Sequence, residues 1–165
     1  MRKLALTLAL FVSVAAAPAF AATPEQQIGA TLDALHAAAA KADGPAYFAL
    51  YTPDAVFIGT DASERWDMTA FKAYATPSFA KGQGWTYVPR ERHITIAPIA
   101  CRCVAWFDEL LDSAGYGTSR GTGTLMLTPD GWKVSQYALT FPIPNDLAND
   151  MTAKIRAFEA KAKAK

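Results

Sequence analysis

The sequence has few of the residues that build metal sites and nucleophilic catalytic centres. Among its 165 residues are two cysteines and two histidines, and His36 and His93 lie far in sequence from Cys101 and Cys103. A structural zinc site takes four such ligands, and neither histidine has a serine or cysteine at a recognisable spacing. We therefore expect no metal site, no cofactor, and structural or solvated roles for both histidines.

The chain also lacks an excess of charge of either sign, with 16 basic and 15 acidic residues. Nucleic acid binding depends on lysine and arginine clustered on one face, and the only local concentration is the alternating Lys/Ala tail at residues 161–165. We expect this tail to form a solvated helix end, where cations suit the helix dipole. The composition gives no support to nucleic acid as a partner.

Long apolar runs are missing except near the start of the chain. There, two basic residues precede an apolar stretch over residues 4–14, and Ala19-Phe20-Ala21 forms a small-x-small cleavage site. The stretch is shorter than the roughly 20 residues of a membrane-spanning helix. We therefore expect a signal peptide over residues 1–22, no membrane anchor, and a mature protein that is periplasmic or secreted.

The two cysteines are separated by one residue, Arg102. On an extended strand, side chains at i and i+2 point to the same face, whereas a disulfide requires Cβ vectors that converge. We therefore expect Cys101 and Cys103 to be buried free thiols, which behave as small core hydrophobes.

Residues 23–165 have the length of one domain, and their patterns place helices before strands. Helices are predicted from Thr23 as N-cap, over residues 43–51, and from Asp67 toward Pro77, with a brief strand at residues 55–59. Four strands should follow at residues 85–96, 100–111, 116–127 and 132–140. A last helix, capped at residues 144–146, should carry Leu147, Met151, Ile155 and Phe158 on one side. This order indicates an α+β fold in which helices pack on a curved antiparallel sheet.

In this order of elements the mature chain resembles the SnoaL-like branch of the nuclear transport factor two-like superfamily. The matching segments are residues 54–60, 64–66, 107–109, 120–123 and 131–134. The resemblance implies a cystatin-like cone over residues 23–144, followed by a C-terminal helix and tail at 145–165. Many such cones have histidines on the final strand. The matching positions here are Gln136 and Ala138, which counts against a base or metal ligand there.

Glu109 and Arg120 are the first candidates for a binding site. They lie symmetrically about a predicted turn at residues 112–115, so we expect them to face each other across two strands as an ion pair. The pair is either structural or lines the cavity, where the planar guanidinium of Arg120 would hold a polar group of a ligand.

Four further candidates are Asp61 and Trp66, in the segment where a cone of this family opens, and Tyr87 and Gln136 on strands. Trp66 is either a rim for an apolar ligand or a core residue. The facing of Tyr87 and Gln136 stays open, because a register error of one residue would reverse it.

Three functions are compatible with these residues. The first is binding of a small, largely apolar ligand with a polar head in the cone cavity. The second is an enzyme of the isomerase or cyclase type, by analogy with ketosteroid isomerase and polyketide cyclase relatives, in which a carboxyl such as Glu109 or Asp61 moves a proton. The third is a homodimerisation module without a ligand. We expect the first.

Overall fold

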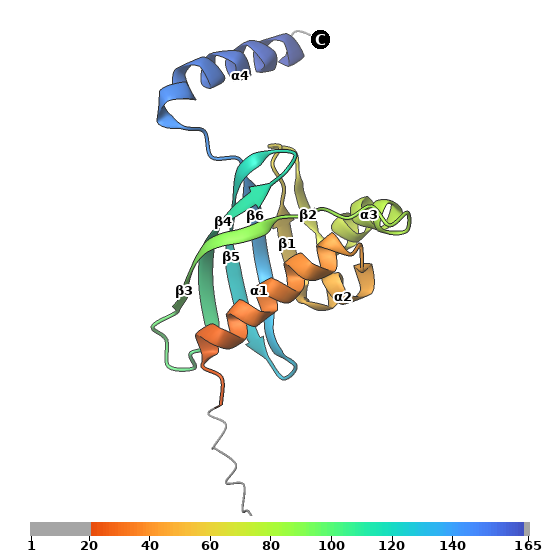
Figure 1. Ribbon diagram of the computed structural model, residues 1–165, viewed down its shortest axis with the longest axis vertical. Coiled ribbons are helices and arrows are strands. Elements are labelled where there is room, and N and C mark those ends of the chain that lie inside the picture. Colours follow the sequence, from red (N-terminus) through yellow and green to blue (C-terminus); the bar gives the residue numbers. More distant parts are fainter. Residues whose placement is uncertain (1–20, 164–165) are drawn as a thin grey trace, which may run out of the picture.

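A six-stranded sheet forms the body of the protein in the computed structural model, which describes residues 21–163 (Figure 1). The helices are α1 (Pro24–Ala40), α2 (Gly44–Ala49), α3 (Met68–Phe79), the 3-10 helix η1 (Asn145–Leu147) and α4 (Ala148–Lys163). The strands are β1 (Tyr51–Ile58), β2 (Arg65–Asp67), β3 (Val88–Ile96), β4 (Val104–Ser113), β5 (Gly117–Thr128) and β6 (Gly131–Thr140).

The predicted starts of the first three helices are confirmed. Thr23 and Gln26 form a reciprocal capping box, in which the Gln26 N–H donates to Thr23 Oγ1 at 3.2 Å and the Thr23 N–H donates to Gln26 Oε1 at 2.9 Å. Asp43 caps α2, and Asp67 caps α3 by accepting from the Ala70 N–H at 2.8 Å. Each cap satisfies backbone donors that a helix start leaves unpaired.

The sheet has the order β2-β1-β6-β5-β4-β3. Strands β3 to β6 form the predicted antiparallel meander, but β1 pairs with β6 in parallel, so the sheet is mixed rather than antiparallel throughout. The second helix was expected to reach Tyr51, whereas α2 ends at Ala49 and β1 begins at Tyr51. Pro53 is tolerated within β1 because it falls where the β1–β6 register is interrupted.

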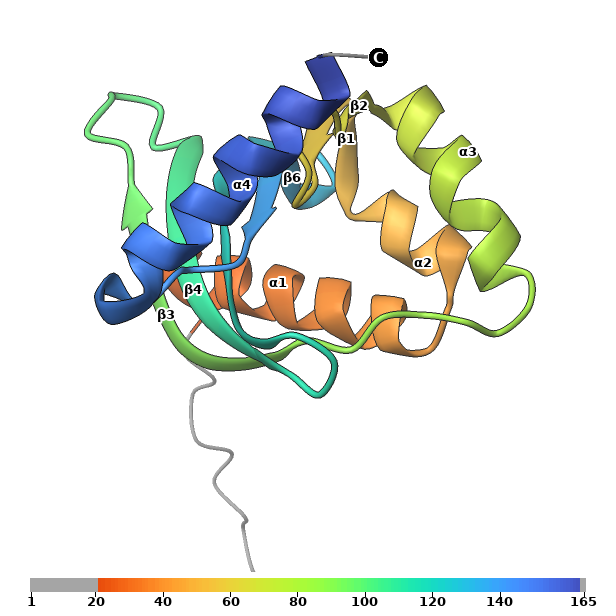
Figure 2. The ribbon, with the colours of Figure 1, turned by 90° about the horizontal axis from the view of Figure 1, so that it is seen from above.

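The helices α1, α2 and α3 enclose the concave face of the sheet (Figure 2). Helix α1 contacts β3 and β6, and α3 contacts β1 and β2. Between these layers lies a core rich in aromatic rings, in which Phe71 packs on Phe57 with ring centroids 4.0 Å apart. The concave face is therefore where an interior space can form.

Helix α4 stands away from this body (Figure 1). None of its residues is buried, and among residues 21–163 its main contacts with another element are with η1. The apolar side of α4 predicted from the sequence is exposed, with Phe158 74% accessible.

The prediction of free thiols is wrong, because Cys101 and Cys103 form a disulfide with Cα atoms 5.1 Å apart. The two cysteines lie in the turn before β4 rather than on a strand, and Arg102 between them has a φ of 47°. This left-handed backbone turns the two Cβ vectors toward each other, which an extended strand cannot do.

The predicted signal peptide lies almost wholly outside the described residues and stays a prediction. Within residues 21–163, no helix is both long and apolar enough to cross a membrane. The same part of the chain has no group of three or more histidine, cysteine, aspartate or glutamate side chains arranged to hold a metal ion.

Candidate functional site

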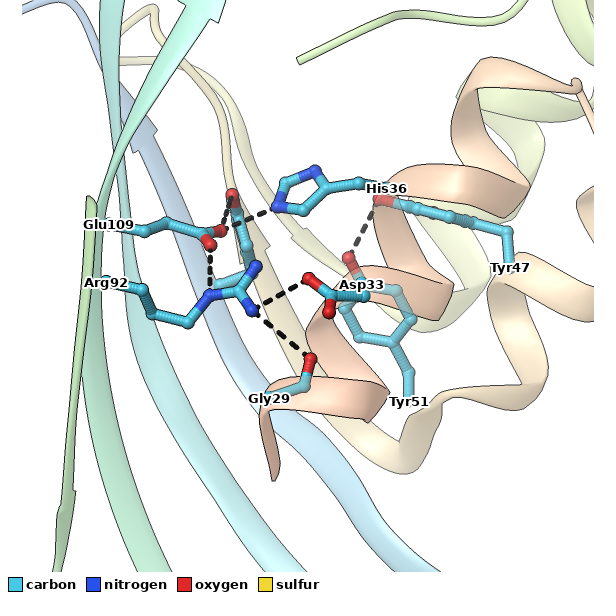
Figure 3. A network of polar contacts seen from close by, with 8 residues as sticks. Gly29, Asp33, His36, Tyr47, Tyr51, Arg92 and Glu109 are labelled. Carbon is cyan, nitrogen blue, oxygen red and sulfur yellow. Dashed lines mark hydrogen bonds and ion pairs between the residues drawn. The ribbon is translucent and has the colours of Figure 1, made fainter. Parts of the chain in front are cut away.

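Glu109 is a fully buried carboxylate at the centre of a polar network on the concave face (Figure 3). Its Oε2 accepts from Arg92 Nε at 2.8 Å, and its Oε1 lies 2.7 Å from His36 Nε2 and accepts from the Tyr137 hydroxyl at 3.1 Å. These partners come from β3, α1 and β6. The carboxylate therefore joins the edge strand β3 and the inner strand β6 to the helix that covers them.

The network rests on strand register and helix periodicity. Arg92 and Glu109 are direct partners across β3 and β4. Opposite them, Gly29, Asp33 and His36 share one face of α1 through their i, i+4, i+7 spacing. Arg92 Nη1 donates to Asp33 Oδ1 at 2.8 Å and to the Gly29 carbonyl at 3.2 Å. Arg92 thus links α1 to the sheet.

The charges in the network fix its protonation. Burial raises the pKa of Glu109, but the hydrogen bond and charge of His36 and the charge and hydrogen bond of Arg92 outweigh burial and leave this pKa below its ordinary value. Burial, followed by the charge of Glu109, raises the pKa of Tyr137 well above its ordinary range. Glu109 is therefore an ionised acceptor at neutral pH, and His36 Nε2 carries the proton between the two side chains.

A glycine lets Tyr137 reach Glu109. Gly121 on β5 lies beside Glu109 on β4, and a Cβ placed at Gly121 would collide with the Tyr137 hydroxyl. The tyrosine side chain from β6 therefore crosses β5 at a position that has no side chain, which is a common reason for glycine within a strand.

A cavity of about 340 Å³ opens beside this network, between the β1–β2 end of the sheet and α3. Most of its wall is aromatic. The lining residues are Phe57, Gly59, Thr60, Glu64, Trp66, Phe71, Tyr74, Trp85, Tyr87, Tyr116, Leu139 and Phe141. Thr60, Glu64 and the tyrosine hydroxyls add polar groups to this wall. A concave aromatic wall with placed polar groups is typical of sites for small organic ligands.

A smaller chamber of about 20 Å³ continues the cavity toward the network. The two spaces share Phe57, Trp85, Tyr87 and Leu139, and the chamber adds Leu35, His36, Ala39, Tyr47 and Tyr137 to its lining. Tyr47 lies 2.8 Å from the Tyr51 hydroxyl, oxygen to oxygen, and burial raises the pKa of both tyrosines. The chamber therefore adds the polar tips of His36, Tyr47 and Tyr137 to the deep end of the cavity.

Another hollow, of about 580 Å³, lies between α2 and α3. It is lined by small and apolar residues, with Lys72 and Thr76 as its polar side chains. It does not share a wall residue with the cavity or with the Glu109 network, so we assign the candidate site to the cavity.

Three of the residues predicted from the sequence lie at this site. Trp66 and Tyr87 line the cavity, and Trp66 stacks on Tyr74 with centroids 4.6 Å apart. Glu109 lies behind the chamber and acts on it through His36 and Tyr137. Asp61 is exposed in the β1–β2 loop, where it bonds Ser63, and does not line the cavity, although Glu64 of the same loop does.

The predicted pairing of Glu109 with Arg120 is wrong. Glu109 faces Gly121, and Arg120 faces Leu110. The turn between β4 and β5 has three residues between the paired Ser113 and Gly117, which shifts the register by one position. Arg120 is therefore exposed on the face opposite Glu109.

Gln136 also lies away from the cavity. It precedes Tyr137 on β6, so the alternation of the strand directs it to the outer face. It is not among the residues that line the cavity or the chamber.

Sequence reasoning missed His36 and Arg92, although both carried a signal. His36 is four residues from Leu32 on the apolar side of the predicted first helix. Side chains two residues apart on a strand point to the same face. Arg92 is therefore on the same face as Ile94 and Ile96, and Glu109 is on the same face as Phe107 and Leu111. Charged side chains on the core-facing side of a strand or helix need oppositely charged or hydrogen-bonding partners, because burying an unpaired charge is costly.

The model of the SnoaL-like domain family matches residues 28–144, which include the network and the cavity. The chain belongs to this family. No curated protein matches the chain.

Solved structures similar to this SnoaL-like domain share its fold. An NTF2-like protein from Pseudomonas putida aligns with a TM-score of 0.60 at 16% identity, covering 73% of this chain and 88% of its own. A candidate dehydratase of the NTF2-like family from Streptomyces avermitilis has a TM-score of 0.61 at 15% identity, with 73% and 97% covered. A candidate ketosteroid isomerase from Shewanella frigidimarina has a TM-score of 0.55 at 16% identity, with 70% and 96% covered. At these identities the likeness concerns the fold.

Proposed function

We propose that the protein binds a small, largely apolar organic molecule in the cavity, with an oxygen-bearing group of the ligand directed toward His36 and Tyr137. The observation that carries this proposal is the cavity of about 340 Å³ whose aromatic wall leads to a chamber with polar tips. Flat apolar rings fit such a wall, because aromatic side chains offer large contact areas at low conformational cost. The polar tips at the deep end would orient the ligand.

A thermal shift measurement tests the proposal. A panel of planar and alicyclic compounds with one carbonyl or hydroxyl group is added to the purified protein, and native mass spectrometry identifies any molecule that copurifies. A specific ligand should stabilise the fold by about 2.7 kcal/mol at a hundred times its dissociation constant.

Two variants and a control sharpen this test. Leu139→Trp should fill the passage between cavity and chamber, and Trp66→Ala should remove part of the rim, so both should weaken binding. Arg120→Ala, on the outer face, should bind as the wild type does. The proposal fails if no compound stabilises the wild type, or if Leu139→Trp folds normally and binds with unchanged affinity.

Proton transfer is a second candidate function, favoured by the 2.7 Å contact between His36 and Glu109 at the wall of the chamber. The ionised Glu109 carboxylate accepts a hydrogen bond from His36 Nε2 and so orients the imidazole ring. The other ring nitrogen, Nδ1, is then the atom that can accept a proton from a ligand. A ligand with acidic C–H bonds beside a carbonyl would be the matching substrate class. His36→Gln should then abolish deuterium uptake at those carbons while ligand binding persists, whereas uptake at the wild-type rate would exclude this role.

Export to the periplasm and homodimer formation stay predictions from the sequence. N-terminal sequencing of the exported protein tests the first, with cleavage expected after Ala21 or Ala22. Sedimentation equilibrium tests the second.

A further inference from the structure

The loop at residues 97–103 presents the disulfide at the edge of the molecule, beyond the ends of β3 and β4 (Figure 1). Cys101 is exposed and Cys103 is half-buried. Backbone hydrogen bonds hold the loop on both sides: the Arg102 N–H donates to the Ile99 carbonyl at 3.0 Å, and the Leu127 N–H donates to the Cys103 carbonyl at 2.8 Å. The disulfide therefore lies on a hydrogen-bonded loop, and solvent reaches it at Cys101.

This disulfide contributes little to the stability of the fold. A disulfide stabilises mainly by restricting the unfolded chain, and the restriction grows with the length of the loop that it closes. The loop here contains a single residue, Arg102, between the two cysteines. Closing such a short loop removes few conformations, so opening it leaves the rest of the fold in place.

The closed loop also holds Arg102 in an unfavourable backbone conformation. Its φ of 47° is left-handed, a region that costs free energy for residues other than glycine. Reduction frees the loop from the constraint that imposes this φ. Exposed disulfides that relieve strain when reduced are the labile and catalytic ones, in contrast to buried structural disulfides.

The surroundings of the disulfide are apolar and carry a positive charge. Ile99 is 47% exposed and Leu127 is 46% exposed, although both are large hydrophobic residues. Arg102 is the only charged residue among residues 97–103, and a neighbouring cation favours a thiolate over a thiol. An extended apolar polypeptide that carries thiols would find apolar contacts here, because Ile99 and Leu127 are exposed and their backbones are hydrogen-bonded to the disulfide loop.

We propose that Cys101 and Cys103 form a redox-active site that transfers its disulfide to a pair of thiols in an extended, apolar polypeptide. A substrate thiolate attacks Sγ of the exposed Cys101, the Cys101–Cys103 bond breaks, and Cys103 leaves as a thiolate beside Arg102. The second substrate thiolate then attacks the substrate sulfur of this mixed disulfide, and Cys101 leaves as a thiolate. The substrate is oxidised by two electrons and the cysteine pair is reduced by two, and a small-molecule disulfide such as oxidised glutathione reoxidises the pair.

Reduction and turnover of the whole mature protein test this proposal. Alkylation and mass spectrometry should show that reduced glutathione opens the disulfide while circular dichroism stays that of the native fold. A reduced peptide with two cysteines among apolar residues, supplied with oxidised glutathione, should be oxidised at least tenfold faster with the wild type than with Cys101→Ser/Cys103→Ser.

Single variants test the assignment of the two sulfurs. Each single variant is first converted to a mixed disulfide with glutathione at its remaining cysteine and then given a reduced peptide that has one cysteine. Cys103→Ser should exchange glutathione for the peptide on Cys101, with release of reduced glutathione, and Cys101→Ser should exchange much less because Cys103 is half-buried. The equilibrium constant for reduction of the disulfide by glutathione should be about tenfold lower in Arg102→Gly than in Arg102→Lys, since glycine adopts a left-handed φ without cost. A disulfide that opens only when the protein unfolds, or equal peptide oxidation by the wild type and the double serine variant, would overturn the proposal.

Discussion

At the scale of single residues, the buried carboxylate of Glu109 determines how the interior is organised. Removing an ionised carboxylate from water is expensive unless charged or hydrogen-bonding partners replace the solvent. Here Arg92, His36 and Tyr137 supply those partners, and the pKa of Glu109 falls despite its burial. The network therefore favours the ionised form in the folded protein.

This lowered pKa predicts a pH-dependent contribution to stability. Because the folded-state pKa of Glu109 lies below its ordinary value of 4.5, the contribution is complete above about pH 4.5 and is lost as the pH falls through the folded-state pKa. Glu109→Gln should reduce the free energy of unfolding by about 3 kcal/mol at pH 7, since it leaves Arg92 without its buried partner. The gap between variant and wild type should narrow in acid.

Urea unfolding at a series of pH values measures this difference. Asp108→Asn is the matched control, because Asp108 is the neighbouring carboxylate on β4 and is exposed. The control should change stability by less than about 0.5 kcal/mol. A gap between wild type and Glu109→Gln that stays constant from pH 7 into acid would show that ionised Glu109 does not stabilise the fold.

At the scale of elements, the site depends on how β5 passes between Glu109 and Tyr137. Gly121→Ala places a methyl group where the Tyr137 hydroxyl lies, so either the tyrosine or the strand must move. We expect a loss of about 1–3 kcal/mol in the free energy of unfolding, together with weaker ligand binding because Tyr137 lines the chamber.

Gly115→Ala is the control for this substitution. No atom lies within 4 Å of a Cβ placed at Gly115, so its stability should match that of the wild type. Thermal unfolding by circular dichroism compares the two variants. Equal stability of the two would mean that Tyr137 does not need the space above Gly121.

At the same scale, the sequence predicts some features of the fold and leaves others open. Helix starts at Thr23 and Asp67 are predictable because a cap involves residues three apart. The register of β4 on β5 was missed by one position, since it depends on one additional residue in a turn. The contact between His36 and Glu109 joins residues 73 positions apart, which no local pattern specifies. Most of the fold and the rim at Trp66 were therefore predictable, but the polar network was not.

At the scale of the whole molecule, the chain has two unequal parts. The family match ends at residue 144, and the helices and strands that form the core also lie before that position. Beyond it, η1 and α4 contribute no buried residue. Stability and ligand binding should therefore reside in residues 23–144.

Deleting residues 145–165 tests this division. Because α4 contacts mainly η1 and buries none of its residues, the truncated protein should unfold within about 0.5 kcal/mol of the wild type and bind the same ligands. Ile28→Ala shows the sensitivity of the measurement, since this fully buried side chain on α1 should cost about 2–5 kcal/mol when truncated. Urea unfolding compares the three proteins. A loss on deletion as large as that of Ile28→Ala would show that α4 packs on the body in solution, because a helix without buried contacts contributes almost nothing to the folding of the rest of the chain.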